Sequence, residues 1–197
     1  MSTNLFDELQ ADETTMARLH KQLERAADTA DVLDVAYRTI DTPVGTLLLA
    51  ASTAGLVRVA YDVEGHDAVL AGLAERISPR VLRAPARLDT VAQQIDEYFA
   101  KRRTVFEVPV DLRLAEGFRR NVIEHLRDIG YGRRESYAAV AAAIGNPRAV
   151  RAVGTACAHN PLPVVIPCHR VVRSDGSTGQ YVGGPLAKST LLDLEAA

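Results

Sequence analysis

Residues 136–157 read SYAAVAAAIGNPRAVRAVGTAC, and this stretch predicts two short helices joined by a tight turn. Ser136 is placed to cap the first helix, expected over Tyr137–Ile144, because a serine oxygen accepts a hydrogen bond from an unpaired amide of the first turn. Gly145 ends that helix, and Asn146 is expected to cap the next one, with Pro147 at its first position. The stretch therefore indicates a helix-turn-helix, a motif found in many DNA-binding domains.

The second expected helix has one face of small side chains. Ala149, Ala152 and Ala156 recur at three- and four-residue spacing, so another surface can approach that face closely. Arg148 and Arg151 flank it. This combination favours contact with nucleic acid, although tight packing against another helix would also explain the small residues.

The chain upstream of the helix-turn-helix alternates between strand-like and helical patterns. Apolar and β-branched runs separated by turn residues predict antiparallel strands, and two amphipathic stretches predict helices. No cluster of catalytic residue types is evident there, so this part is interpreted as a scaffold. The strands are expected at Asp34–Ile40, Gly45–Ala51, Leu56–Tyr61 and Thr104–Val110, and the helices at His66–Ile77 and Leu88–Ala100.

Three segments are therefore predicted, and the fold class is α+β. Residues 1–32 form a charged helical extension, with a thin apolar stripe at Met16, Leu19, Leu23 and Ala27. Residues 33–112 form the scaffold domain with its antiparallel sheet. Residues 113–197 form a mostly helical domain, in which a further amphipathic helix is expected over Phe118–Ile129.

Charge is divided unevenly along the chain. Residues 1–112 contain 12 Lys and Arg against 18 Asp and Glu, a net of −6, whereas residues 113–197 contain 11 against 7, a net of +4. A basic C-terminal part suggests a polyanionic partner, although ordinary solvated surface is the alternative. No apolar run approaches the roughly 20 residues of a membrane span, and the N-terminal stretch is too polar for a signal peptide. We expect a cytoplasmic protein without a membrane partner.

The two cysteines, Cys157 and Cys168, are expected to be free thiols, because structural disulfides are rare in a reducing cytosol. The nearest histidines are His159 and His169. Their spacing from the cysteines lacks the paired pattern that chelation usually needs. We therefore expect neither a metal site nor a cofactor.

The segment NPLPVVIPCHRVV, residues 160–172, delivers Cys168 between a proline and a histidine after a run typical of a buried strand. A free cysteine is most often a small core residue. A reactive one needs a base, and His169 held by Glu195 could accept the thiol proton. Neighbours on an extended strand point to opposite faces. Either the chain turns sharply at Cys168, or a water bridges Cys168 and His169.

These residues, with their flanking motifs, resemble the O6-alkylguanine-DNA alkyltransferase family, the methylated-DNA–protein-cysteine methyltransferases. The resemblance covers residues from about 118 to 195 and is weaker upstream. It implies a ribonuclease H-like N-terminal domain and a winged-helix-like C-terminal domain. The motifs that carry it are Pro167-Cys168-His169-Arg170, Gly154 and Asn160-Pro161 before it, and Gly179, Tyr181, Gly183 and Gly184 after it.

The resemblance implies direct reversal of DNA damage. The protein would flip O6-alkylguanine out of double-stranded DNA, bound through the minor groove, and move the alkyl group irreversibly to Cys168 in a single turnover. His169 would be the water-mediated base, Glu195 would orient it, and Asn160 would brace the turns around the cysteine. O4-alkylthymine as a second substrate stays open. The protein would be a monomer in solution, nucleoid-associated when bound to DNA, with cooperative assembly on DNA left open.

The resemblance also assigns roles in binding the DNA and the base. Arg151 would fill the stack that the flipped base leaves, with Arg148 beside it. Tyr137 would crowd the phosphate to promote flipping and donate a hydrogen bond to the base. The expected pocket residues are Tyr181 on the wall, Gly183 shaping its loop, the carbonyl of Val171 and the amide of Val182 contacting the base, and Lys188 neutralising charge that develops on guanine.

Three rival interpretations are open at the level of sequence. A thiol hydrolase would use Cys168, His169 and Asn160 and would turn over repeatedly. A sensor would flip alkylated bases without chemistry, but the intact cysteine argues against it. A helix-turn-helix regulator would read base edges in the major groove, for which the small-sided second helix offers few side chains.

Overall fold

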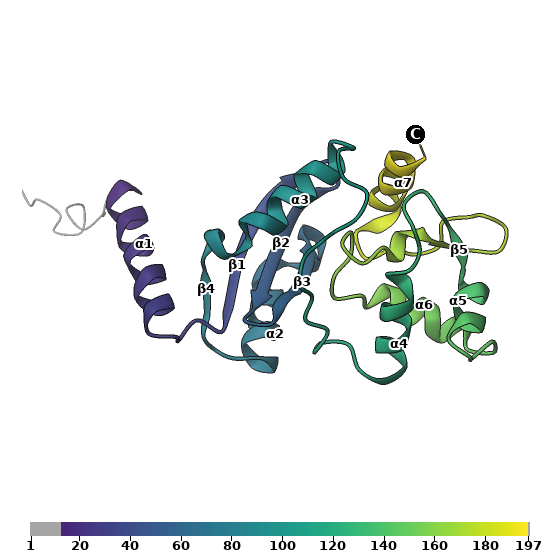
Figure 1. Cartoon of the computed structure of the whole chain (residues 1–197), viewed down its shortest axis with the longest axis horizontal. Helices are drawn as coiled ribbons and strands as arrows, with labels where there is room; N and C mark the ends of the chain where they lie inside the picture. The colour runs from purple at the N-terminus through teal and green to yellow at the C-terminus, as the bar shows by residue number, and fades with distance from the viewer. Residues whose placement is uncertain (1–12, 197) are drawn as a thin grey trace, which may run out of the picture.

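A four-stranded sheet forms the N-terminal half of the chain, and a group of short helices forms the C-terminal half (Figure 1). The structure is a computed structural model and describes residues 13–196. The strands are β1 (Val35–Thr42), β2 (Gly45–Ser52), β3 (Gly55–Tyr61) and β4 (Val81–Arg83), in the order β3-β2-β1-β4.

Helices cover both faces of the sheet. Side chains alternate between the faces along each strand, so Leu48 and Ala50 lie in a cluster with Leu73 of α2 (His66–Arg76). Leu47 and Leu49 belong to the larger cluster on the other face, which includes the apolar side of α3 (Asp89–Phe99) and extends into the C-terminal half. Short 3₁₀ turns precede α2 and α3, at Asp62–Glu64 and Pro85–Leu88. The scaffold is thus packed on both sides and continuous with the core of the helical half.

The strand predictions are confirmed for β1, β2 and β3, which pair antiparallel, but the prediction for Thr104–Val110 is wrong. That run contributes only an isolated bridge between Val110 and Leu56, and Pro109 within it has no amide hydrogen to donate. The fourth strand is instead β4, which pairs parallel to β1. The sheet is therefore mixed, and not antiparallel throughout.

The helical half contains α4 (Gly117–Leu126), α5 (Tyr137–Ala143), α6 (Val150–Ala158) and α7 (Gly184–Glu195). Two short strands, β5 (Glu135–Ser136) and β6 (Val171–Val172), pair parallel to each other beside these helices. Sequence patterns did not predict this pair, because two residues are too few to show alternation. It ties the start of the helix-turn-helix to the segment that follows Cys168.

The helix-turn-helix is present, but its second helix begins later than predicted. The Ser136 cap is confirmed, since Oγ accepts from the Ala139 amide at 3.0 Å. Gly145 follows α5 with φ +75°, a conformation that favours glycine. Asn146 does not cap α6, because its side chain donates back to the Ile144 carbonyl at 3.1 Å. The helix starts at Val150, so Pro147 and Arg148 belong to the turn.

The small-sided face of α6 is also narrower than predicted. Ala156 is buried with Val153 and Cys157, so it belongs to the side that packs on the core. Ala152 is exposed, and Ala149 lies just before the helix and is half-buried. The outward small surface is therefore limited to the first turn of α6.

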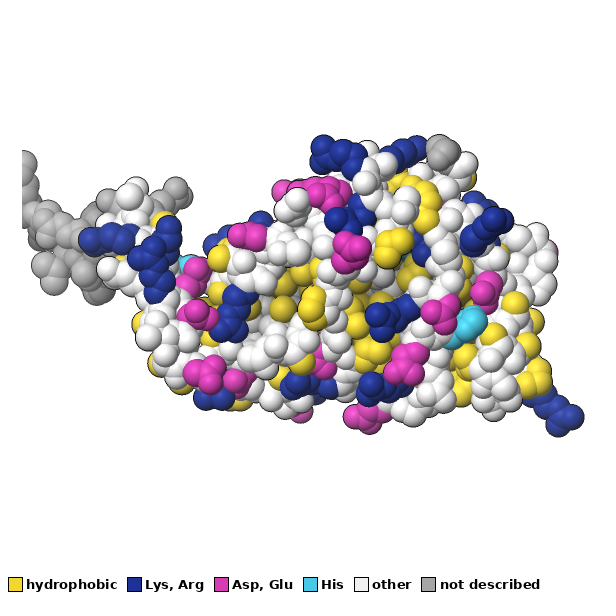
Figure 2. Space-filling model, in the orientation of Figure 1, with side chains coloured by type: hydrophobic (Ala, Val, Ile, Leu, Met, Phe, Trp, Pro, Cys, Tyr) yellow, Lys and Arg dark blue, Asp and Glu magenta, His cyan; other side chains and the backbone are white. Residues whose placement is uncertain are grey.

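The N-terminal extension contains α1 (Glu13–Thr29), which stands at the left of the molecule beside the sheet domain (Figures 1 and 2). It contacts the body through an ion pair between Asp28 and Arg87 and through His20 Nε2, 2.6 Å from the Arg83 carbonyl. Ala27 packs against the core. The rest of its predicted apolar stripe is about half exposed, at Met16, Leu19 and Leu23. Residues 1–12 of the predicted extension lie outside the described part of the chain.

Over residues 13–196, no helix is both long enough and apolar enough to cross a membrane.

Candidate functional site

The chain turns sharply at Cys168. Residues Cys168–Arg170 form one turn of 3₁₀ helix, which follows a looping segment and not the buried strand that was predicted. Within that segment Val164 has φ +70°, an unusual value for a β-branched residue. Cys168 is 1% exposed and His169 is fully covered. The turn lets adjacent residues present their side chains within one buried site.

Asn160 holds this looped segment in place. Its Nδ2 donates to the Ile166 carbonyl at 2.8 Å and to Cys168 Sγ at 3.0 Å, while its Oδ1 accepts from the Leu162 amide at 3.0 Å. One buried amide therefore satisfies two backbone groups and contacts the sulfur. Asn160 is braced against both ends of the loop that carries the cysteine.

The Cys168 thiol is protonated in the resting protein. Burial raises its pKa to about 11, even though the hydrogen bond from Asn160 and the nearby charge of Lys188 act in the opposite direction. Cys157 is also a buried free thiol, and burial raises its pKa further. Only the thiolate is an effective nucleophile, so Cys168 would need a base in order to act as one.

His169 lies next to Cys168 in the chain and has the hydrogen bonding that a base would need. Its Nε2 lies 3.0 Å from Glu195 Oε1, so this nitrogen carries the hydrogen and donates it to the carboxylate. Nδ1 is then left with a free lone pair, and this buried atom has no hydrogen-bond partner among residues 13–196. Burial lowers the pKa of His169 despite the neighbouring Glu195. The imidazole is consequently neutral and able to accept a proton through Nδ1.

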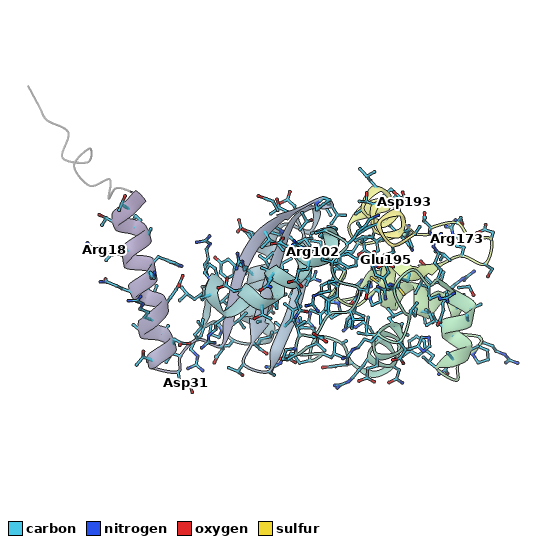
Figure 3. All side chains as sticks on the ribbon, turned by 45° about the horizontal axis from the view of Figure 1, so that its top comes forward. Arg18, Asp31, Arg102, Arg173, Asp193 and Glu195 are labelled. Atoms are coloured by element: carbon cyan, nitrogen blue, oxygen red, sulfur yellow. The ribbon has the colours of Figure 1, made fainter. Side chains whose placement is uncertain are left out.

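Glu195 is held by four groups at once. Burial alone would raise its pKa, but hydrogen bonds, first from His169 and then from Arg170, outweigh burial and lower the pKa to about 2. Arg170 donates to both carboxylate oxygens, and the Tyr98 hydroxyl donates to Oε1 at 2.7 Å. The Gly132 amide donates to Oε2 at 3.2 Å. Figure 3 shows Glu195 on α7, where that helix meets the sheet domain.

The predicted pocket loop packs against the N-terminal sheet. Tyr181 is buried, and its hydroxyl lies 3.1 Å from that of Tyr61 at the end of β3. The two rings meet edge to face, with centroids 5.7 Å apart. Gly183 has to be small, because a Cβ there would lie 2.6 Å from the Tyr61 ring. The half-buried Val182 lies between these two contacts.

Lys188 is fully buried in α7, which is rare for a lysine. Its Nζ donates to the Val171 carbonyl at 2.6 Å and lies 5.8 Å from the centre of the Tyr137 ring. Burial lowers its pKa. Lys188 thus links α7 to Val171 of β6 and to Tyr137 of α5.

The structure therefore brings most of the predicted site residues together around Cys168. Arg148 and Arg151 stand apart, exposed on the turn before α6 and on its first residues. An exposed position is what a contact with DNA requires.

Sequence reasoning missed Tyr61, Tyr98 and the bidentate role of Arg170. Tyr98 lies on the buried face of α3, and a buried tyrosine hydroxyl usually has a hydrogen-bond partner. That signal could have pointed to a polar contact, but it could not have named Glu195.

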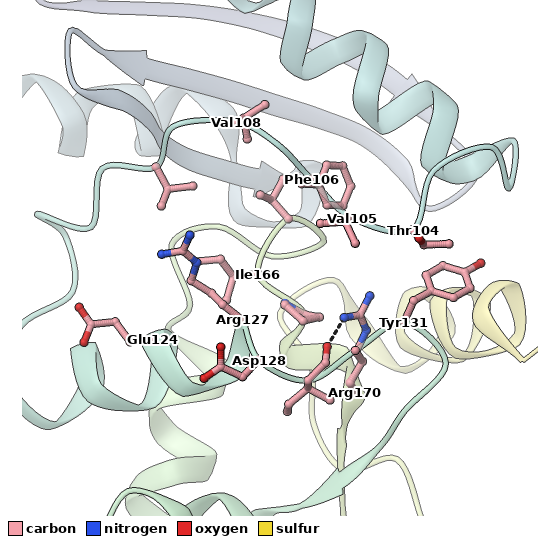
Figure 4. Close-up of a pocket in the computed structure, with 15 residues that line it drawn as sticks. Thr104, Val105, Phe106, Val108, Glu124, Arg127, Asp128, Tyr131, Ile166 and Arg170 are labelled. Carbon is pink, nitrogen blue, oxygen red and sulfur yellow. Dashed lines mark hydrogen bonds between the residues drawn. The ribbon is translucent and has the colours of Figure 1, made fainter.

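A crevice of about 320 Å³ lies behind the site, between the loop at residues 104–110 and the segment leading to Cys168 (Figure 4). Its lining includes Phe106, Tyr131, Ile166 and Arg170. Arg170 donates there to the Ile129 carbonyl. The residues that line the crevice come from both domains. Among residues 13–196, no group of His, Cys, Asp and Glu side chains is arranged to hold a metal ion.

Comparisons with known proteins match this architecture over both domains. A family model described as 6-O-methylguanine DNA methyltransferase, ribonuclease-like domain, matches residues 35–112, and the DNA binding domain of the same family matches residues 117–197. A methylated-DNA–protein-cysteine methyltransferase of Mycolicibacterium paratuberculosis is 38% identical over 161 residues, which cover 82% of this chain and 92% of that protein.

Solved structures agree. The O6-methylguanine methyltransferase of Mycobacterium tuberculosis superposes with a TM-score of 0.73 at 36% identity, over 82% of this chain and 93% of that one. The same organism's OGT in complex with DNA superposes with a TM-score of 0.70, also at 36% identity, over 82% and 92%.

The fold and the matches over both domains define the class as DNA-repair proteins that transfer a methyl group from methylated DNA to a protein cysteine. The chain belongs to the 6-O-methylguanine DNA methyltransferase family. The predicted family and the α+β fold class are both confirmed.

Proposed function

We propose that the chain repairs DNA by flipping O6-alkylguanine from the duplex and moving the alkyl group irreversibly to Cys168, one group per molecule. The enzyme activity itself, transfer of a methyl group from methylated DNA to a protein cysteine, follows from family membership. The proposal concerns the residues and the stoichiometry. The arrangement that supports it best is Cys168 held by Asn160 next to a neutral His169 oriented by Glu195.

The proton moves first in this mechanism. A water between Cys168 and Nδ1 of His169 carries the thiol proton to the imidazole, and Glu195 stabilises the imidazolium that forms. The thiolate attacks the alkyl carbon as the carbon–oxygen bond breaks. The electron pair of that bond stays on guanine, and the proton taken from the thiol passes from the His169 imidazolium to guanine, so that guanine and the imidazole are both neutral again. The product on sulfur is a thioether, which has no carbonyl for water to attack.

Burial of Cys168 supports base flipping. An alkyl group on guanine O6 lies inside the duplex, so a covered sulfur cannot reach it unless the nucleotide leaves the stack. In the proposal Arg151 fills the vacated position from the minor groove, and Arg148 contacts the backbone next to it. Tyr137 and Tyr181 flank the base, the Val171 carbonyl and the Val182 amide contact its edge, and Lys188 offsets the charge developing on it.

The hydrolase alternative fits the geometry less well. A Cys–His–Asn triad needs the asparagine to orient the histidine. Asn160 donates to the sulfur and to a backbone carbonyl, whereas the partner of His169 is Glu195. The polar group that orients the base is therefore a carboxylate.

The test is the intact mass of the protein after mixing with excess duplex DNA containing O6-methylguanine. We expect a gain of one methyl group that stops at one per molecule and maps to Cys168. Cys168→Ser should gain nothing, while Cys157→Ser, a matched change at the other buried thiol, should gain one. Continued turnover without a stable adduct on Cys168 would overturn the proposal in favour of a hydrolase.

A further inference from the structure

We propose that Tyr98, which the N-terminal domain contributes, is a positioning residue for the transfer reaction and acts on His169 through Glu195. This inference rests on the proposed function, because it assigns a role in the proton transfer from Cys168. It gives the scaffold domain an indirect part in the chemistry, through the position and charge of Glu195.

The hydrogen bonds at Glu195 Oε1 carry the proposal. This one oxygen accepts from the Tyr98 hydroxyl at 2.7 Å and from His169 Nε2 at 3.0 Å. Arg170 Nη2 also donates to it, at 2.9 Å. A carboxylate oxygen has only acceptor sites, so Tyr98 and His169 share its negative charge. A change at either donor is felt by the other.

Tyr98 is held rigidly enough to fix that oxygen. Its side chain is fully buried, and its ring packs against Phe99 and Phe106 at 5.3 Å and against Tyr131 at 6.1 Å, measured between ring centroids. Burial, and then the charge of Glu195, raise the pKa of Tyr98, so its hydroxyl stays protonated and continues to donate. The carboxylate is thereby clamped by Arg170 from its own domain and by Tyr98 from the other.

Few other ionisable groups lie around His169 and Glu195. Arg170 and Lys188 are the cations that act on His169, and Tyr181 faces its ring at 6.4 Å. Tyr131 lies near the carboxylate but donates to the Leu194 carbonyl at 3.2 Å. Removing the Tyr98 hydroxyl leaves more of the charge of Glu195 to His169, which favours the imidazolium. The base would then be lost at a higher pH, and its ring would be less firmly held.

The experiment compares Tyr98→Phe with Tyr131→Phe, which also removes a tyrosine hydroxyl from the same aromatic group but no donor to Glu195. Single-turnover transfer from duplex DNA with O6-methylguanine is measured as a function of pH. Tyr98→Phe should slow transfer roughly tenfold, the value of one charge-assisted hydrogen bond. It should also move the acid limb of the profile to higher pH. Tyr131→Phe should leave that limb where it is.

A nuclear magnetic resonance titration measures the pKa of His169 directly. It does not require the transfer reaction, and it can be carried out on any variant that folds. In Tyr98→Phe the imidazole should titrate at higher pH than in the wild type. Superimposable titrations and pH profiles would overturn the inference, as would an equal shift in Tyr131→Phe, which would indicate a merely structural effect. If the wild type itself places no alkyl group on Cys168, the proposed function fails instead, so the two failures are distinguishable.

Discussion

The Nδ2 atom of Asn160 lies 3.0 Å from Cys168 Sγ and donates a hydrogen bond to it. The same nitrogen donates to the Ile166 carbonyl, two residues before the cysteine. A single side chain therefore sets both the path of the loop and the electrostatic surroundings of the sulfur. Stability and reactivity are joined at this residue.

We expect Asn160→Ala to lower the free energy of unfolding by about 3 kcal/mol, because it removes three buried hydrogen bonds and leaves the Leu162 amide without a partner, while the Ile166 carbonyl keeps only the bond from the Cys168 amide. Urea denaturation measures this loss. Asn146→Ala is the matched control, since Asn146 is exposed and its single bond to Ile144 lies in a surface turn. Its effect should stay within about 0.5 kcal/mol. Equal losses in the two variants would contradict the bracing role.

We expect Gly183→Ala to destabilise the protein by about 1–3 kcal/mol, because the new methyl group meets the Tyr61 ring. Gly183 has an ordinary φ of −79°, so the penalty comes from contact and not from the backbone. In a Tyr61→Leu background the same substitution should cost clearly less. A double-mutant cycle by thermal denaturation measures the difference, and strictly additive effects would refute this contact.

Arg151→Ala should slow transfer from duplex DNA more than transfer from the free O6-alkylated base. The reason is that Arg151 is exposed, lies outside the buried cluster and is proposed to act only on the stack. Parallel single-turnover rates on the two substrates provide the test. Arg148→Ala, on the turn before α6, should weaken duplex binding in a salt-dependent way with a smaller effect on the rate. An equal loss on both substrates would exclude a flipping role for Arg151.

The protein should lose stability in acid through Glu195. Its folded-state pKa of about 2 is below the ordinary value of about 4.3 for a glutamate. The stabilisation that the ionised Glu195 provides is therefore complete when the pH is above the ordinary pKa of a glutamate, and it is lost as the pH falls toward 2. It amounts to about 3 kcal/mol. His169 adds loss in the same direction near its ordinary pKa of about 6.5, because its lowered folded-state pKa favours the neutral form.

Unfolding free energies between about pH 7 and pH 2 provide the measurement. Glu195→Gln should be less stable at neutral pH and show a flatter decline over the acid range. Glu116→Gln, at an exposed carboxylate, should follow the wild type. If the unfolding free energy of Glu195→Gln fell with pH as steeply as that of the wild type, the hydrogen bonds to Glu195 would not be what lowers its pKa.

Local signals in the sequence predicted those parts of the fold that depend on near neighbours. Ser136 and Gly145 mark the limits of α5 because a cap and a left-handed residue act within a few positions. The start of α6 was misplaced because the Asn146 side chain can bond backward as readily as forward. β4 was missed because three residues show no period, and its place beside β1 depends on packing.

The candidate site likewise has a part that could be predicted from the sequence and a part that could not. Cys168 and His169 are adjacent in sequence, so their chemistry was open to prediction. Tyr98 and Tyr61 reach Glu195 and Tyr181 across 97 and 120 positions, and no periodicity spans such separations. The elevated pKa of Cys168 was likewise invisible, since it follows from three-dimensional burial and not from its neighbours along the chain.

That burial also determines which reagents can reach Cys168. Reactive small molecules attack exposed, ionised sulfur, whereas this sulfur is covered, protonated and wedged against an amide. A protein that can accept only one substituent would be spent by a single stray collision. Under the proposed single-turnover mechanism, burial would keep the sulfur unmodified until an alkylated base enters the site.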